Sequence, residues 1–153
     1  GLGLGWTHNL GPRRVDSATV VNRIVRIDNE RNDLVRFMPE MHLWIDRWDE
    51  QRWSWGPFLT VAPGSRIIDA VGFGLMMGYR PHRQDQYSFN VGIGGTLDLD
   101  ARVLGDGLIA NEPLPARETT ARTKQTTAAG LLVLFSVGWD LAAPHHPAHT
   151  ERQ

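Results

Sequence analysis

The stretch VGFGLMMGYR, from Val71 to Arg80, alternates large apolar residues with positions that are almost bare. The large residues share one face of a strand: Val71, Phe73, Leu75, Met77 and Tyr79. Three of the four positions between them are glycine. Successive side chains of a strand point to opposite faces, so this strand carries bulk on one side and very little on the other. Any fold assigned to the chain has to explain that asymmetry.

Alternation with a period of two recurs along the chain, and no helical period of comparable strength competes with it. The alternating runs cover about 1–9, 19–29, 34–48, 52–63, 67–80, 87–105 and 117–139. Segments rich in turn-forming residues separate them at 10–14, 28–33, 49–52, 63–65 and 81–86. The pattern predicts an all-β protein, an antiparallel up-and-down β-barrel of about eight strands, within a barrel domain at 1–140.

Seven runs are an awkward number, because bacterial single-chain barrels have an even number of strands. Either one strand is hidden in this chain, or one precedes Gly1, or the ring is not closed. Two prolines, Pro39 and Pro57, also lie inside runs. Proline cannot donate to a strand ladder, so each of them predicts a sheet edge or a bulge.

The composition of the second face indicates which side of the sheet meets which solvent. In a soluble antiparallel sheet that face is normally rich in charged residues, whereas here it is mostly glycine, serine, asparagine and threonine. Small residues suit the crowded lumen of a narrow barrel, with the apolar face turned outward into lipid. The alternative is a soluble β-sandwich or barrel, extracellular or virion-associated, that serves as a structural subunit of a virion or secretion complex.

The last run carries a resemblance to a known class of protein. Its apolar positions are Leu131, Val133, Phe135, Val137 and Trp139, and the run ends in an aromatic residue. It resembles the closing strand of bacterial outer-membrane β-barrels, although the sequence DLAAPHHPAHTERQ follows the aromatic residue. The resemblance implies a location in the bacterial outer membrane, contact with the lipid bilayer, and a structural or surface-interaction role. The six tryptophans, which lie near the ends of runs, are expected in the aromatic girdles of such a barrel.

Charged residues on the inward face form the candidate site. The candidates for an interior polar network are Arg36, Glu40, His42, Asp98 and Arg102. Buried charges need partners, and both signs are present. A lipid-modifying barrel enzyme is an alternative, in which His42 would act with Glu40 or Asp46 and with Ser54. The close His-x-Ser pairing of a barrel deacylase is missing, so no catalytic residue is predicted.

Few other ligands are suggested by the sequence. The net charge is −1, which gives no electrostatic basis for binding nucleic acid. The chain has no cysteine, and the histidines at 145, 146 and 149 lack a carboxylate at ligand spacing, so neither a metal nor a cofactor is predicted. Residues 141–153 are interpreted as a flexible tail, and the long segment 105–118 as an external loop that displays a contact site for a protein partner.

Overall fold

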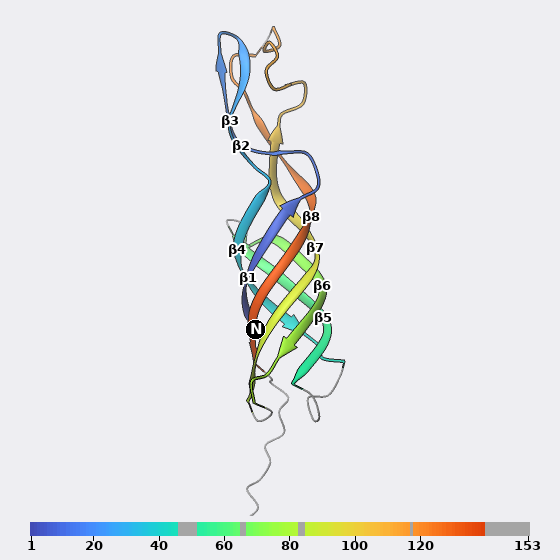
Figure 1. Cartoon of the computed structure of the whole chain (residues 1–153). Coiled ribbons are helices and arrows are strands. Elements are labelled where there is room, and N and C mark those ends of the chain that lie inside the picture. Colours follow the sequence, from blue (N-terminus) through green and yellow to red (C-terminus); the bar gives the residue numbers. More distant parts are fainter. Residues whose placement is uncertain (46–51, 65–66, 83–84, 117, 140–153) are drawn as a thin grey trace, which may run out of the picture.

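The structure is a computed structural model that describes residues 1–45, 52–64, 67–82, 85–116 and 118–139. These residues form eight antiparallel strands and no helix (Figure 1). The strands are β1 (Leu2–Asn9), β2 (Arg14–Val21), β3 (Ile24–Arg31), β4 (Asp33–His42), β5 (Trp53–Gly64), β6 (Ile67–Tyr79), β7 (Tyr87–Leu104) and β8 (Thr123–Trp139). The predicted all-β class and the total of about eight strands are confirmed, but only six of the eight described strands form the ring. The predicted tail at 141–153 lies outside the described residues.

Six of these strands form a closed ring, in the order β1-β4-β5-β6-β7-β8. Strand β8 pairs back onto β1 over Leu2↔Val137 to Asn9↔Gly130, which closes the ring. The other two described strands, β2 and β3, form a hairpin between β1 and β4 that extends beyond one end of the ring (Figure 1). We call that end of the ring upper, and the end near Trp139 lower.

The eighth strand, missing from the seven predicted runs, belongs to this hairpin. The run predicted at 19–29 contains a two-residue turn at Asn22 and Arg23, whose φ angles are 53° and 63°. Both lie in the left-handed region, as a type I′ hairpin turn requires. The turn predicted at 28–33 is wrong, since β3 continues to Arg31 and β4 begins at Asp33. Charged residues there belong to an exposed strand rather than to a loop.

The glycines of the alternating strands face the inside of the ring, where side chains from other strands occupy the space. A Cβ on Gly72 would lie 2.5 Å from the Leu132 side chain, and one on Gly92 would lie 2.8 Å from Phe58. The buried core of the ring is apolar: Met38, Phe58, Ala62, Ala70, Met76, Leu132 and Leu134. The bare face is therefore the inner face, as predicted, but the middle of the interior is a packed apolar core rather than a polar lumen.

The seam between β4 and β5 is the shortest in the ring, with only Glu40↔Thr60, Met41↔Leu59 and His42↔Phe58 as paired residues. Two backbone hydrogen bonds extend it downward, from the Leu43 and Ile45 N–H groups to β5.

Proline explains why this ladder does not extend upward. The Glu40 N–H donates to the Gly1 carbonyl, on the side of β1, whereas the Leu43 and Ile45 N–H groups donate to β5. By alternation the amide of Pro39 faces β5, where it has no hydrogen to donate. The Thr60 hydroxyl donates to the Pro39 carbonyl instead, at 2.7 Å. Pro57 occupies β5 on the other side of the same seam, so the two prolines predicted to mark an edge or a bulge, Pro39 and Pro57, both lie at this short seam.

We expect this seam to be where the ring opens first. Amides of Met41 and Leu43 should exchange with deuterium at least about tenfold faster than amides of Val91 and Ile93, because short ladders open locally at low free-energy cost. Exchange measured residue by residue on the folded protein would test this. Equal protection of the β4–β5 and β6–β7 ladders would contradict it.

The hairpin β2–β3 packs against residues 105–122, and we call these two segments the head. Its core contains Val25, Leu108 and Leu114, with Val20, Leu104 and Ala121 packed around it. Residues 111–114 hydrogen-bond to β3, including the Val25 N–H to the Glu112 carbonyl at 3.0 Å. The segment predicted as a free loop at 105–118 does project beyond the ring (Figure 1), but its described residues are part of a small folded unit.

Candidate functional site

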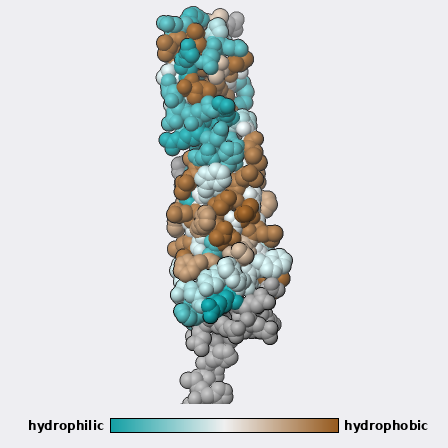
Figure 2. All heavy atoms as spheres, viewed as in Figure 1, coloured by the Kyte–Doolittle hydropathy of each residue, from teal (hydrophilic) through white to brown (hydrophobic). Residues whose placement is uncertain are grey.

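Large apolar side chains cover the outside of the ring. Figure 2 shows them as a brown band across the visible face of the barrel, with the more polar head above it. Phe73 is 56% exposed and Ile93 67% exposed. Other exposed members on the ring strands are Leu2, Leu4, Trp6, Val35, Phe37, Met41, Trp53, Trp55, Leu59, Leu75, Met77, Phe89, Val91, Leu97, Leu99, Leu131, Phe135 and Trp139. We call this surface the belt; it lies on the same strand positions that the alternation marked as outward.

The height of the belt and its aromatic margin can be traced along single strands. On β8 the outward residues are apolar from Ala129 to Trp139. The next outward residues toward the head, Thr127 and Gln125, are polar. A tilted strand needs about 9 to 11 residues to cross a bilayer, which this stretch matches. Trp139 pairs with Tyr87 at the lower margin.

Other tryptophans lie at different places. Trp53 packs on Tyr79 at the lower margin with ring centroids 4.7 Å apart. Trp44, expected in a girdle, instead packs against the interior core; it lies just beyond β4, whose even-numbered residues from Arg36 to His42 point inward. Its ring lies 4.3 Å from that of His42. Trp48, also expected in a girdle, lies outside the described residues.

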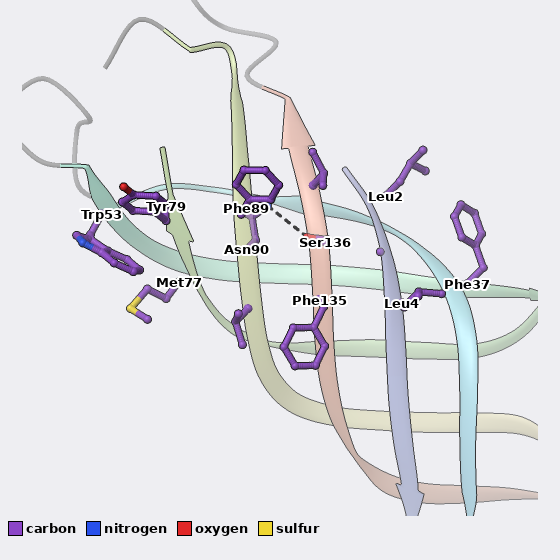
Figure 3. Close-up of a pocket in the computed structure, with 13 residues that line it drawn as sticks. Leu2, Leu4, Phe37, Trp53, Met77, Tyr79, Phe89, Asn90, Phe135 and Ser136 are labelled. Carbon is purple, nitrogen blue, oxygen red and sulfur yellow. Dashed lines mark hydrogen bonds between the residues drawn. The ribbon is translucent and has the colours of Figure 1, made fainter. Parts of the chain in front are cut away.

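A groove of about 510 Å³ runs across the strands within the lower half of the belt (Figure 3). Its walls are two rows of outward side chains, each continuous across paired strands. The row nearer the head contains Phe37, Leu4, Phe135, Val91 and Met77. The row nearer the lower margin contains Leu2, Val137, Phe89, Tyr79 and Trp53.

Between the two rows lies one row of residues whose side chains point inward. Gly3 pairs with Ser136, and Ser136 pairs with Asn90. The Asn90 amide and the Ser136 hydroxyl hydrogen-bond to each other at 3.2 Å (Figure 3). These two polar side chains are thus engaged inside the ring, and the groove itself is lined almost entirely by carbon.

The lower interior holds a buried polar cluster centred on Glu40. His42 Nδ1 lies 2.7 Å from Glu40 Oε2, and the Ser136 hydroxyl donates to Glu40 Oε1 at 3.1 Å. The Asn90 amide lies 3.2 Å from the Ser136 hydroxyl. The Glu40 carboxylate can only accept hydrogen bonds, and the Ser136 hydroxyl donates to it. Two of the predicted network residues, Glu40 and His42, are brought together here.

This order of groups differs from that of a serine hydrolase. In such an enzyme the histidine lies between the serine and the carboxylate, whereas here the carboxylate lies between His42 and Ser136. The Glu40 side chain is completely buried and that of His42 is 8% exposed. Ser54 is buried as well, and Asp46 lies outside the described residues. The cluster has the character of interior packing.

A second polar cluster closes the upper end of the ring. Arg36 and Arg14 both contact Asp98 Oδ2, at 2.5 and 2.8 Å. Arg14 also lies 3.4 Å from Asp16, which in turn pairs with Arg31 at 3.2 Å. Positive and negative groups thus alternate from the ring into the head. The predicted partners Arg36 and Asp98 belong to this cluster, separated from Glu40 and His42 by the apolar core.

Arg102 is not part of the interior, contrary to the prediction. The register of β7 shifts between Asp98 and Ala101, so that both Asp100 and Ala101 are buried and Arg102 is exposed. An extra residue in a strand reverses the faces of everything that follows.

Beyond the bulge, Asp106 pairs with Lys124. Lys124 and, to a smaller extent, Arg122 hold the pKa of Asp106 below its usual range. The Lys124–Asp106 pair therefore persists at neutral pH and is lost as the pH falls through that lowered pKa.

Three interior participants were missed from the sequence. Asn90 and Ser136 lie on the inward faces of their runs, and only the pairing of β7 with β8 brings them to the same place. Arg14 was missed because it falls in the turn predicted at 10–14. The sequence does not indicate that β2 begins at Arg14 or that this side chain reaches back to the ring. A rule that polar residues on an inward face seek cross-strand partners would have found the first two.

Comparison with known proteins gives no assignment, since no family model, curated protein or solved structure matches the chain. Among the described residues there is no helix long and apolar enough to cross a membrane. Nor do the described histidines, aspartates and glutamates contain a group of three or more placed to hold a metal ion.

Proposed function

We propose that the protein is a non-catalytic β-barrel of a bacterial outer membrane, with a structural or surface-interaction role, and that it carries the head on the outer side. The observation that supports this most strongly is the belt: large apolar side chains are exposed on all six ring strands. Soluble monomers rarely expose a contiguous apolar patch beyond a few hundred Å². A surface of this extent is expected where the solvent is lipid.

The backbone pairing of the ring supports the same proposal. In hydrocarbon, unpaired N–H and C=O groups are costly, so strands cross a membrane only as closed barrels. The ring has six strands, fewer than the eight of small outer-membrane barrels. Its narrow bore accounts for the inward glycines and for the absence of a water-filled lumen among the described residues. A surface role therefore suits it better than transport through the bore.

The orientation follows from the lengths of the connections. Such barrels have short turns on the inner side and longer loops outside. The head contains both the β2–β3 hairpin and the connection from β7 to β8. Placed outside, it presents exposed residues such as Val21 and Ile109 to a protein partner. A catalytic role is not proposed, because the polar groups of both interior clusters hydrogen-bond or form ion pairs with one another.

Reconstitution into phospholipid vesicles tests the proposal. Lipids brominated on their acyl chains should quench the fluorescence of belt residues such as Trp53 and Trp139, because these rings would touch the chains. Without detergent or lipid the protein should aggregate. A protein that stays monomeric in buffer and shows no quenching would instead support the soluble alternative, a subunit of an assembly whose partners cover the belt.

A further inference from the structure

We propose that the groove across the lower belt holds one acyl chain of a membrane phospholipid, with the head group at the end formed by Trp53 and Tyr79. This inference rests on the proposed membrane location. It goes further by assigning a defined site to one lipid molecule rather than a general contact with the bilayer.

The spacing of the groove walls selects a thin, flexible occupant. Residues two apart on a strand are about 6.7 Å apart, and this sets the distance between rows such as Leu2–Val137–Phe89 and Leu4–Phe135–Val91. Carbon atoms attract each other best at about 3.5 to 4.0 Å. The gap between the rows therefore admits nothing wider than a single file of methylene groups. The volume of about 510 Å³ lies in the range of pockets that hold small ligands, about 300 to 1,000 Å³.

The hydrogen-bonding state of the groove excludes a peptide strand as occupant. A peptide added to a sheet needs free backbone groups along an edge. The floor of the groove is the continuous ladder of β7, β8 and β1, in which Asn90, Ser136 and Gly3 are paired in register. Because the floor has no free hydrogen-bonding groups, it suits an occupant that neither donates nor accepts hydrogen bonds. A hydrocarbon chain is such an occupant.

One end of the groove can bind a polar group. The Trp53 and Tyr79 rings pack against each other at that end and contribute an indole N–H and a phenol hydroxyl at the lower margin of the belt. Such side chains prefer the boundary between hydrocarbon and head groups, since one part is apolar and the other is a hydrogen-bonding group. The opposite end, at Phe37 and Leu4, is apolar. This polarity orients the lipid with its ester groups toward Trp53 and Tyr79.

Two substitutions on one strand test the site. Val137→Trp places an indole in the groove, whereas Val133→Trp makes the same change on the same outward face of β8, where Val133 pairs with Trp6 and Ile93 outside the groove. The protein in mild detergent is titrated with 1-palmitoyl-2-oleoyl phosphatidylethanolamine, and bound lipid is counted by native mass spectrometry. We expect one lipid on the wild type and on Val133→Trp, and at least tenfold weaker binding by Val137→Trp.

The outcomes separate this inference from the proposed function. Equal binding by all three proteins, or no lipid retained by the wild type, overturns the groove site. Vesicle quenching is measured on the same three proteins. Quenching without a bound lipid leaves the membrane barrel standing and removes the site, whereas a lipid that binds in detergent without vesicle insertion removes the membrane barrel and leaves the acyl-chain site.

Discussion

Arginine in place of Phe73 or Ile93 is expected to lower the free energy of unfolding in a bilayer by about 2 to 4 kcal/mol. Both side chains point out from the ring, with exposed fractions of 56% and 67%. Both lie well inside the apolar stretch of their strands, on β6 and β7. A guanidinium at such a depth has to be carried into hydrocarbon or to draw water after it, and the cost falls toward the interfaces.

A matched control lies in the head. Ile109 is 57% exposed, close to the value for Phe73, but it lies beyond the belt. Ile109→Arg should change stability by no more than about 0.5 kcal/mol, as surface substitutions usually do. Urea titration of all three variants in lipid vesicles measures the differences. If the belt variants lose no more stability than Ile109→Arg, the belt does not face hydrocarbon.

Much of the ring could be predicted because strand alternation is exact. Once Gly72, Gly74 and Gly78 are assigned to one face, the sides of Phe73 and Leu75 follow with no further information. The outward orientation of the belt depends only on this parity. The same parity puts Phe58, an even-numbered residue in a run whose odd positions are mostly large, on the inner face, where it is buried.

Parity fails wherever a residue is inserted, and the sequence gives no sign of where that happens. The bulge between Asp98 and Ala101 exposes Arg102, although the alternation placed it inside. The hairpin at Asn22 and Arg23 was missed because its left-handed turn contains no glycine.

Long-range partners are a second limit. Glu40 and Ser136 are 96 positions apart, and only closure of the ring brings them together. The head was missed for the same reason, since Val25 and Leu114 meet through a connection that reads as an irregular loop.

A single methyl group added at Gly94 is expected to destabilise the ring strongly. A Cβ there would lie 1.9 Å from the Phe73 carbonyl oxygen and 2.7 Å from the Gly74 Cα. These are backbone atoms of β6, which cannot rotate away as a side chain would. The two strands would have to separate, with loss of ladder hydrogen bonds in the wall of the ring. Gly94→Ala should therefore cost about 3 kcal/mol, the upper end of the usual range for overpacking.

The next residue supplies the control, because Gly95 points to the other face of the same strand. Its nearest neighbour for an added Cβ is Phe73 Cζ at 3.6 Å, an ordinary contact. Gly95→Ala should leave stability unchanged or raise it by up to about 1 kcal/mol, since alanine loses less backbone entropy than glycine on folding. Unfolding by urea in vesicles compares the two. Equal effects would mean that β6 and β7 do not approach closely at Gly74 and Gly94, and the inward glycines would then need an explanation other than a narrow ring.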